Sequence, residues 1–391
     1  MTAPAPWRRP VAALAGVAAA ALLASGCSGG LLSSGSSSDA SGPIKLGMVA
    51  PMSGSSAAIG PYMRNGAQLA IDEINDKGGV NGRQLALRVE DGACDPKTAT
   101  AAANKLVTDD IAVSVGGYCS GATLPTLPLF NKADVPMLIP AANSNDLVDQ
   151  HLPNVFLING TGTQQADTAV AWMKKVGAKR VSLMDDNTSY SKNIADLAAQ
   201  LLSQGTPALA GRQSVTPGES DYSANVNAVV SQHPDFVYWT GYYQEGGLII
   251  RQLRQAGYTG DIMVADGSVD QKLIDIAGGS NADGVFATMT QTPQTIPGAE
   301  KWISDYKAKF GSEPGPYSTQ AYDAVRVAAE AIKNAGSTNG AKVEKALEGI
   351  DGFQLFSGPL KFTPDHTLSE GGFQILVVDG GKFTLKDAMT Q

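Results

Sequence analysis

The sequence predicts an α/β protein built from two doubly wound lobes, each a parallel sheet covered by helices. Two observations predict this class. Short apolar runs alternate with stretches of about ten to fifteen residues that have helical periodicity, which is the pattern of parallel sheets with helices on both faces. The chain also has 391 residues, 43% of them apolar, which is enough material for more than one core.

The first strand and helix illustrate the alternation. Residues Ile44–Ala50 (IKLGMVA) form an apolar run typical of a buried strand. Apolar residues then recur at 67, 70, 71 and 74, which is one face of a helix. Gly78 and Gly79 follow, and glycine is the residue that most often ends a helix.

The same reasoning applies to the rest of the chain. Further strands are expected at Leu85–Glu90, Ala112–Val115, Met137–Ile139, Val155–Ile158, Val181–Met184, Phe236–Thr240, Asp261–Val264 and Gly284–Ala287. Helices are expected at Lys97–Thr108, Gln164–Val176, Ser191–Ser203, Tyr222–Ser231 and Gly246–Ala256. In such sheets, ligands bind beyond the carboxyl ends of the strands.

Composition excludes several classes of protein. The chain carries 29 Lys plus Arg against 37 Asp plus Glu, a formal net charge of -8, and its pI is near 5.0. Phosphate binding needs a basic surface, so nucleic acid is not expected as a partner. The apolar fraction also argues against a disordered chain or a small disulfide-dependent scaffold.

The N-terminus has the pattern of an export signal. Arg8 and Arg9 precede the apolar stretch Val11–Ala24, whose 14 residues are too few to span a bilayer as a helix. We therefore expect residues 1–26 to be a signal peptide.

The residues around Cys27 resemble the lipobox of bacterial lipoproteins, because Leu-Ala-Ser-Gly stands directly before that cysteine. The resemblance implies lipidation of Cys27, although Ala24 stands where a larger aliphatic residue is commoner. The alternative is ordinary signal cleavage, or an uncleaved anchor, with Cys27 incidental. Residues 27–43 are then the lipidated cysteine and a flexible tether, since Ser28–Gly42 holds seven Ser, four Gly and one charge.

Cys94 and Cys119 are the two cysteines that remain in the exported body. Outside the cytoplasm, two such cysteines are expected to pair. A disulfide between them would close a loop of about 25 residues and add roughly 3 kcal/mol of stability. No metal site is expected, because the chain has three His in all and no Cys-x-x-Cys motif.

Catalytic signatures are absent from the sequence. It contains no G-x-S-x-G elbow, no phosphate loop of the G-x-x-x-x-G-K-[ST] type, no H-E-x-x-H, and no G-x-G-x-x-G opening a helix. His151 lies in a polar stretch and His233 precedes a proline, so both are interpreted as solvated residues and neither as a general base. No enzymatic activity and no cofactor are expected.

A series of motifs, in order along the chain, resembles the periplasmic branched-chain amino-acid binding proteins, the leucine/isoleucine/valine receptors of ABC importers. The motifs are Met52–Gly54, Asn75–Gly82 (NDKGGVNG), Asp91–Lys97 (DGACDPK), Gly116–Thr123 (GGYCSGAT), Pro140–Ala142, Tyr238–Glu245 (YWTGYYQE), Ile250–Gln252 and Asp266–Gly267. The resemblance runs from about Ile44 to the C-terminus. In that family the two corresponding cysteines form a disulfide, in agreement with the pairing expected above.

The resemblance implies a type I periplasmic binding protein clamshell, with two lobes joined by three crossings of the chain. The crossings are expected near Asn159–Thr163, Ala287–Gln291 and Gly371–Leu376. Lobe 1 would comprise residues 44–160 plus 290–372, and lobe 2 residues 161–289 plus 373–391.

A free amino acid presents a carboxylate and an ammonium, and a receptor must offer donors to one and acceptors to the other. Ser120 is expected where a strand ends and a helix begins, so its hydroxyl and nearby N–H groups can meet the carboxylate. By resemblance, the backbones of Ala141 and Asn143 complete that half of the site. The alternative for Ser120 is a simple helix N-cap.

Asp266 and Tyr242 are the candidates for the ammonium. Each follows a predicted strand, and the resemblance implies a carboxylate and a tyrosine at these places. A charge-assisted hydrogen bond in a dry cleft is worth roughly 1.5 to 3 kcal/mol. The alternative for Asp266 is a turn aspartate before Gly267, which is common for Asp-Gly pairs.

The resemblance implies that Tyr118, Ile59, Tyr190 and Tyr317 line the pocket for the ligand's side chain. Each of the four could instead be ordinary core or hinge packing. Three positions depart from the family: Asp266 stands where the family has Glu, Asn143 where it has Thr, and Ile59 where it has an aromatic residue. The departures bear on the identity of the ligand more than on its class.

The sequence thus predicts a monomeric, lipid-anchored receptor outside the cytoplasmic membrane. It would bind a small branched-chain or aliphatic amino acid between the lobes and deliver it to the transmembrane subunits of an ABC permease. One alternative is a sensor of the same fold that binds an amide, urea or another small solute. Another is an extracytoplasmic hydrolase that uses Asp266 and a tyrosine.

Overall fold

A computed structural model describes residues 42–203 and 205–389, which belong to one compact unit that begins at Gly42. The predicted signal peptide, Cys27 and nearly all of the predicted tether lie outside the described residues. Within those residues, none of the helices combines the length and the apolar character that crossing a membrane requires.

Two large sheets define two lobes. The first sheet is parallel and its strand order is β2-β1-β3-β4-β5. Its strands are β1 (Ile44–Ala50), β2 (Leu85–Asp91), β3 (Val113–Ser114), β4 (Met137–Ile139) and β5 (Val155–Leu157). Because β1 lies between β2 and β3, the chain winds outward in both directions from it. The doubly wound arrangement predicted from the sequence is therefore present.

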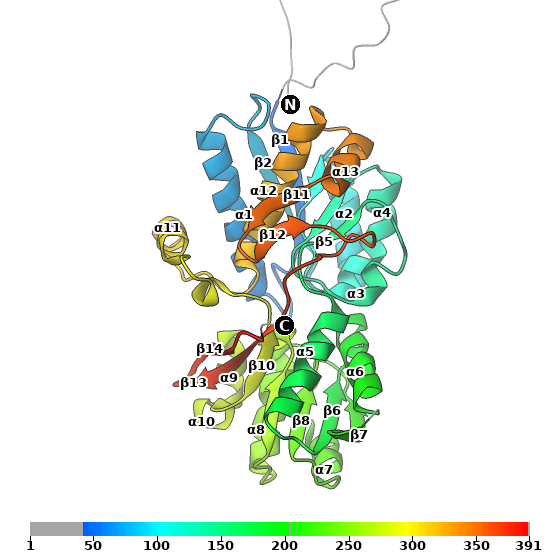
Figure 1. The fold of residues 1–391 in the computed structure, drawn as a ribbon, viewed down its shortest axis with the longest axis vertical. Helices are drawn as coiled ribbons and strands as arrows, with labels where there is room; N and C mark the ends of the chain where they lie inside the picture. The colour runs from blue at the N-terminus through cyan, green and yellow to red at the C-terminus, as the bar shows by residue number, and fades with distance from the viewer. Residues whose placement is uncertain (1–41, 204, 390–391) are drawn as a thin grey trace, which may run out of the picture. The chain divides into compact units, whose positions relative to one another are not determined.

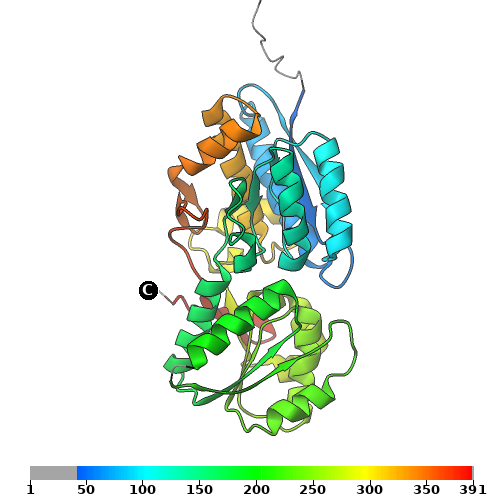
Figure 2. The ribbon, with the colours of Figure 1, turned by 90° about the vertical axis from the view of Figure 1, so that its right-hand side faces the viewer.

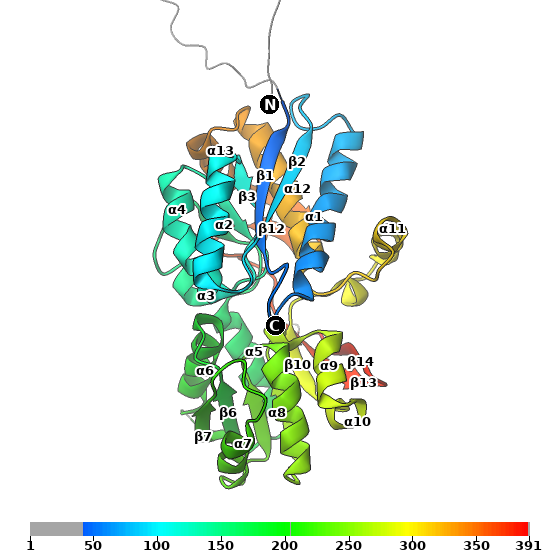
Figure 3. The ribbon, with the colours of Figure 1, turned by 180° about the vertical axis from the view of Figure 1, so that it is seen from behind.

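Helices cover both faces of the first sheet. They are α1 (Ile59–Asp76), α2 (Pro96–Thr108), α3 (Ser120–Thr123) and α4 (Leu127–Lys132), with α12 (Ser318–Ala335) and α13 (Gly340–Glu348) from later in the chain. Helix α11 (Glu300–Phe310) lies to the side of the sheet and contacts α1 (Figures 1 and 3). Helices α1 and α12 lie side by side, and α2 and α4 lie on the opposite side of the sheet (Figure 3). Gly66 permits the close approach of α1 and α12, because a Cβ there would lie 2.0 Å from the carbonyl oxygen of Ser318.

The second sheet has the strand order β14-β13-β10-β9-β8-β6-β7. Its strands are β6 (Arg180–Asp185), β7 (Ala208–Ser214), β8 (Phe236–Trp239), β9 (Asp261–Val264), β10 (Phe286–Met289), β13 (Gln374–Asp379) and β14 (Lys382–Asp387). The helices of this lobe are α5 (Gly162–Lys175), α6 (Ser189–Leu202), α7 (Ser223–Val230), α8 (Tyr243–Gln255), α9 (Gln271–Ala277) and α10 (Gly279–Ala282). Helices α5 and α6 cover one face, and α8 and α9 the other (Figures 1 and 2).

The second sheet differs from the prediction at one edge, since β13 runs antiparallel to β10 and β14 runs antiparallel to β13. The reason lies in the turn between them. Gly380 and Gly381 have φ angles of 58° and 78°, the backbone of a two-residue hairpin turn, so no helix crosses back between these strands. A separate hairpin of β11 (Asp351–Leu355) and β12 (Gly358–Lys361) lies outside both sheets.

Several predicted elements start or end elsewhere in the structure. The strand expected at Gly284–Ala287 is β10, two residues later, and the helix expected at Gly246–Ala256 begins already at Tyr243. Strand β7 has no counterpart in the prediction. It is an edge strand of half-exposed residues and includes Gly211 and Arg212, so it lacks the apolar run of a central strand.

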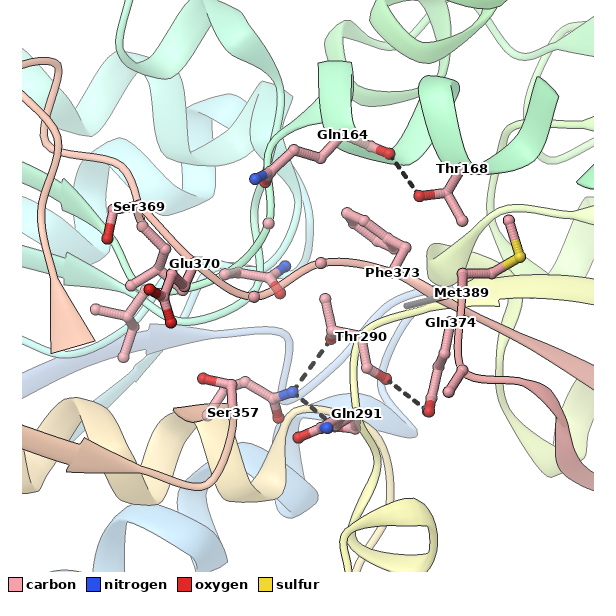
Figure 4. Close-up of a pocket in the computed structure, with 18 residues that line it drawn as sticks. Gln164, Thr168, Thr290, Gln291, Ser357, Ser369, Glu370, Phe373, Gln374 and Met389 are labelled. Atoms are coloured by element: carbon pink, nitrogen blue, oxygen red, sulfur yellow. Dashed lines mark hydrogen bonds between the residues drawn. The ribbon is translucent and has the colours of Figure 1, made fainter. Parts of the chain in front are cut away.

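The chain passes between the two sheets three times, after β5, after β10 and before β13. Residues from all three passages line one polar cavity of about 460 Å³ (Figure 4). Gln320 binds one passage there, since its Nε2 donates to Thr290 Oγ1 at 3.1 Å and to the carbonyl oxygen of Gln291 at 2.9 Å. Gln374, at the end of the passage before β13, donates a hydrogen bond from Nε2 to Thr295 Oγ1 at 2.7 Å. Rotation of the lobes about these segments stays a prediction.

Candidate ligand-binding site

The candidate residues of the second lobe follow the carboxyl ends of neighbouring strands. Asp266 comes directly after β9, and Tyr242 is the N-cap of α8 after β8. Strands β8 and β9 pair in parallel, which places these two residues at the same edge of the sheet. Residues of the first lobe reach across to this edge. The candidate site therefore lies between the lobes, where parallel sheets commonly bind ligands.

Asp266 accepts hydrogen bonds from three side chains, two on helices α5 and α6 and one on the residue before α12. The hydroxyl of Tyr190 lies 2.5 Å from Oδ1, the hydroxyl of Tyr317 lies 2.7 Å from Oδ2, and Gln165 Nε2 lies 2.8 Å from Oδ1. The residue is 2% exposed. Burial raises the pKa of its carboxyl, while the three hydrogen bonds act to lower it.

Tyr317 has a strained backbone at the start of α12. Its φ is 63° and its ψ is 2°, the left-handed region that a bulky side chain seldom adopts. Such residues concentrate at binding sites, because surrounding contacts must hold them in place. The strained backbone of Tyr317 is therefore a structural sign of a site, independent of the sequence argument.

The predicted tyrosines come together around Asp266. The ring centroid of Tyr118 lies 5.8 Å from that of Tyr242 and 5.5 Å from that of Tyr317, and the rings of Tyr190 and Tyr242 are 5.0 Å apart. The Tyr118 hydroxyl also donates to the carbonyl oxygen of Gly267 across the lobes at 3.3 Å. Burial raises the pKa of all four hydroxyls well above the usual value, so they act as neutral donors.

Ser120 is the first residue of α3 and is fully buried. Its hydroxyl oxygen accepts from the backbone N–H groups of Asn143 at 3.3 Å and Ser144 at 3.2 Å. The N-cap of α3 is Cys119, without a side-chain cap, so the alternative reading of Ser120 as a helix N-cap is wrong. Helix α3 has only four residues, which weakens the expected contribution of its dipole.

Asn143 and Ala141 follow β4 and are both buried. Asn143 Nδ2 donates to Gln165 Oε1 at 2.8 Å, and its Oδ1 has no hydrogen-bond partner within the described part of the chain. The carbonyl oxygen of Ala141 accepts from Asn159 Nδ2 at 2.8 Å. A buried amide oxygen without a partner is costly, which marks Asn143 Oδ1 as an acceptor for a ligand.

Ile59 is the first residue of α1 and is 1% exposed. It belongs to the same apolar cluster as Tyr118 and Tyr317. Its burial in this large cluster agrees with the alternative that Ile59 is part of the core, and its contact with a ligand stays a prediction.

Gln165 is a central residue that the sequence analysis missed. Its Oε1 accepts from Asn143 of the first lobe, and its Nε2 donates to Asp266 and to Thr288 Oγ1 at 3.0 Å. One amide thereby joins both halves of the candidate site. The available signal was a polar residue on the buried stripe of α5, next to Ala166 and Ala169.

Hydrogen bonds at the rim also join the lobes. Ser189 Oγ donates to Asp146 Oδ2 at 2.7 Å, and the N–H of Asn145 donates to Asn193 Oδ1 at 3.2 Å. Asn145 and Asp146 lie in the first lobe, and Ser189 and Asn193 lie on α6 in the second. We call these four residues the rim contacts.

Cys94 and Cys119 form the predicted disulfide, with their Cα atoms 5.4 Å apart. The disulfide lies on the wall of a cavity of about 310 Å³ between the lobes, and Tyr242 lies on the same wall. Ser120 stands in the sequence between Cys119 and Gly121, both of which line this cavity. Across residues 42–203 and 205–389, the structure contains no group of three or more His, Cys, Asp or Glu side chains that could hold a metal ion.

The fold agrees with comparisons to known proteins. Residues 43–382 match a family model described as periplasmic binding protein. The chain belongs to this family. The prediction of that family from the sequence motifs is confirmed, and so is the two-lobed α/β fold.

Two curated relatives illustrate the likeness of this periplasmic binding protein. The Leu/Ile/Val-binding protein homolog 3 of Brucella melitensis is 34% identical over 350 residues, covering 89% of this chain and 95% of the relative. The leucine-, isoleucine-, valine-, threonine-, and alanine-binding protein of Pseudomonas aeruginosa is 31% identical over 333 residues, covering 85% and 89%.

Two solved structures have the same fold as this periplasmic binding protein. The leucine binding protein LivK of Thermotoga maritima has a TM-score of 0.81 and 29% identity, covering 88% of this chain and 97% of that one. LivJ of Streptococcus pneumoniae, a branched-chain amino acid transporter substrate binding protein in complex with isoleucine, has a TM-score of 0.82 and 26% identity, covering 89% and 100%.

Proposed function

We propose that this chain is the substrate-binding protein of an ABC importer and that it binds a branched-chain or aliphatic amino acid between its lobes. The observation that carries the proposal is the convergence of Asp266, Tyr190 and Tyr317 with Ser120 and Asn143 in one buried network. The relatives support the ligand class, since their names specify leucine, isoleucine and valine.

The network offers the two kinds of group that a free amino acid requires. Backbone N–H groups after β4 and the Ser120 hydroxyl can donate to a carboxylate. Asp266 and Asn143 Oδ1 can accept from an ammonium in a site that excludes water. The groups for the carboxylate lie in the first lobe and Asp266 lies in the second, so ligand binding would favour a closed arrangement of the lobes over an open one.

The lobes that we propose to move are residues 44–160 plus 290–372 and residues 161–289 plus 373–391. The three passages around the polar cavity of Figure 4 would be the hinge. Loops and element ends of this kind absorb the backbone changes of domain closure.

Calorimetric titration of the full-length protein with each of the twenty amino acids tests the proposed ligand class. We expect one ligand per protein and the strongest heat signal from leucine, isoleucine or valine. No heat with any of the twenty would contradict the proposal.

We further propose that the protein is a monomer anchored outside the cytoplasmic membrane through a lipid on Cys27, where it meets the transmembrane subunits of its permease. The support is the lipobox-like sequence before Cys27. Replacing Cys27→Ser should move the protein from the membrane fraction to the soluble fraction. Retention of the variant in the membrane fraction would contradict the anchor.

We also propose that the protein leaves its ligand chemically unchanged. The site functions through hydrogen bonds, and Asp266 already accepts from three neutral donors. After prolonged incubation, mass spectrometry should recover the bound amino acid intact. A modified ligand would instead support the hydrolase alternative.

A further inference from the structure

Two acidic side chains outside the network of Asp266 lie on the wall of the 310 Å³ cavity between the lobes. Asp186 follows β6, and Glu245 lies in the first turn of α8. Their exposed fractions are 2% and 5%. A buried carboxylate needs a cation or several donors close by, because leaving water is costly for a charge.

The hydrogen bonds of Asp186 leave one of its oxygens unused. Oδ1 accepts from the N–H of Thr188 at 2.9 Å and from its hydroxyl at 2.7 Å, which fixes the turn into α6. Oδ2 is buried and has no hydrogen-bond partner among the described residues. This oxygen lies against the loop before Tyr242, since a Cβ on Gly241 would be 2.8 Å from it. The turn thus accounts for the hydrogen bonds of Oδ1, and Oδ2 remains as an acceptor for a ligand.

Glu245 is similarly short of partners. Its Oε1 accepts from the N–H of Gly218 at 3.0 Å. Burial is the main factor that raises the pKa of both carboxyls, and the charge of Asp186 raises that of Glu245 further. A cation between them would relieve both effects.

The remaining walls of the cavity suit an aliphatic chain that ends in such a cation. The apolar surfaces are the Cys94–Cys119 disulfide, Pro96, Ala122 and Pro217, and hydroxyls come from Ser55, Ser56, Thr188 and Ser189. None of the described residues that line the cavity is a Lys, Arg or His, so the chain supplies no cation of its own there. Methylene groups can pack on the apolar surfaces while a terminal ammonium reaches the acids.

The cavity also adjoins the candidate site for the amino-acid head group. Cys119 and Gly121 flank Ser120, and Tyr242 contacts both the cavity and the tyrosines around Asp266. A ligand held at Ser120 by its carboxylate can therefore extend its side chain into the cavity.

We propose that Asp186 and Glu245 form a subsite for a cationic side chain, so that the protein also accepts amino acids such as lysine and ornithine. The proposal rests on the proposed function, because it assumes that the amino-acid head group binds near Ser120. The cation would sit between Asp186 Oδ2 and the Glu245 carboxylate, with its methylene groups on the disulfide wall.

Norleucine is the matched probe, because its side chain has the same four-carbon length as that of lysine but lacks the ammonium. Titration calorimetry of the full-length protein compares lysine, ornithine, norleucine and leucine. We expect lysine to bind at least tenfold tighter than norleucine, as two charge-assisted hydrogen bonds would give. Equal or tighter binding of norleucine would overturn the subsite.

Two variants test whether Asp186 and Glu245 cause the preference for lysine over norleucine. Asp186→Asn and Glu245→Gln keep side-chain size, and each should reduce the lysine-to-norleucine affinity ratio at least fivefold. Two variants are needed because Asp186→Asn also touches the turn at Thr188. The control is Asp283→Asn, which changes an exposed acid before β10, at the opposite end of the strands from the cavity. Its ratio should match that of the unchanged protein.

The outcomes separate the two proposals. Leucine binding without a preference for lysine overturns the subsite and leaves the proposed function intact. If neither leucine nor any other amino acid binds, the proposed function fails and the subsite fails with it. A lysine preference that survives both Asp186→Asn and Glu245→Gln overturns the assignment of these residues.

Discussion

Asp266 and Asp186 are both buried aspartates that follow parallel strands of the second sheet, yet their surroundings differ. Asp266 accepts from Tyr190, Tyr317 and Gln165, so both of its oxygens are satisfied by side chains from elsewhere in the fold. Asp186 accepts only from Thr188, two residues on, and keeps one buried oxygen without a partner.

The difference shows that burial alone does not define a role for a carboxylate. Neutral donors from both lobes bond Asp266, so this carboxylate joins the two lobes. Asp186 has only local donors and therefore has acceptor capacity left for a ligand.

The largest effect is expected from Asp266→Ala. The change leaves two tyrosine hydroxyls and the Gln165 amide without their acceptor, and it would leave the ammonium of the proposed ligand without an anionic partner. Breaking a buried charge pair costs about 4 kcal/mol, which corresponds to roughly a 1,000-fold loss of amino-acid affinity. Titration calorimetry with leucine measures the loss. Asp283→Ala serves as the control, and full affinity in Asp266→Ala would exclude Asp266 from the site.

A third buried aspartate, Asp323 on α12, is paired with a cation from the protein itself, the side chain of Arg326. Its pKa gives a prediction of how stability depends on pH. Its Oδ1 pairs with Arg326 Nη1 at 2.7 Å, and its Oδ2 accepts from the N–H of Phe356 at 2.8 Å. Burial nevertheless raises its pKa to about 6, from an ordinary value of 3.8. The folded state therefore binds this proton more tightly than the unfolded state.

Below about pH 4 both states carry the proton on Asp323, and between about pH 4 and 6 only the folded state keeps it. This group therefore lowers the free energy of unfolding as pH rises through that window, by roughly 3 kcal/mol in total. Urea unfolding at several pH values should show a smaller decrease in Asp323→Asn than in the unchanged protein. Parallel curves for the two proteins would contradict the assignment.

Ser120→Ala should weaken leucine binding about tenfold, the value of one hydrogen bond to a charged group. The effect is smaller than that of Asp266→Ala because backbone N–H groups of Asn143 and Ser144 remain available to the carboxylate. Ser189→Ala offers a comparison at a hydroxyl that bonds neither Ser120 nor Asp266. An unchanged affinity in Ser120→Ala would remove Ser120 from the carboxylate half of the site.

Ser189→Ala should have the smallest effect, a roughly threefold loss of affinity, because its bond to Asp146 lies at the exposed rim. The loss should come from less frequent closure of the lobes, which a fluorescence energy-transfer pair with one label on each lobe can follow. A change in affinity without a change in closure would mean that the rim contacts do not act as a latch.

Much of the fold could be predicted because its signals are local. Strands β1, β4 and β9 have the bounds that their apolar runs indicate. The helices and strands after Met289 were not predicted, since their arrangement depends on partners far away in the sequence. Strand β13, for example, pairs with β10, and α12 packs on α1.

Site residues could be predicted where a sequence motif indicated them. They could not be predicted where only contacts in the folded structure bring a residue into the site. Asp266, Tyr190 and Tyr317 were named from the resemblance, and the structure brings them within hydrogen-bond distance. Gln165 and Asp186 look ordinary in sequence, one inside a helix and the other after a strand. Their importance arises from partners, or the lack of a partner, that no local pattern reveals.

The C-terminal hairpin of β13 and β14 has a consequence for how the protein is made. These strands complete the second sheet beside β10, although some 85 residues separate β10 from β13 along the chain. During synthesis, β10 therefore keeps an unpaired edge until β13 emerges, and an exposed edge can pair with other chains. The second lobe can be completed only after residues 374–387 have been made, so a chain that stops before Gln374 would leave the ribosome prone to aggregation.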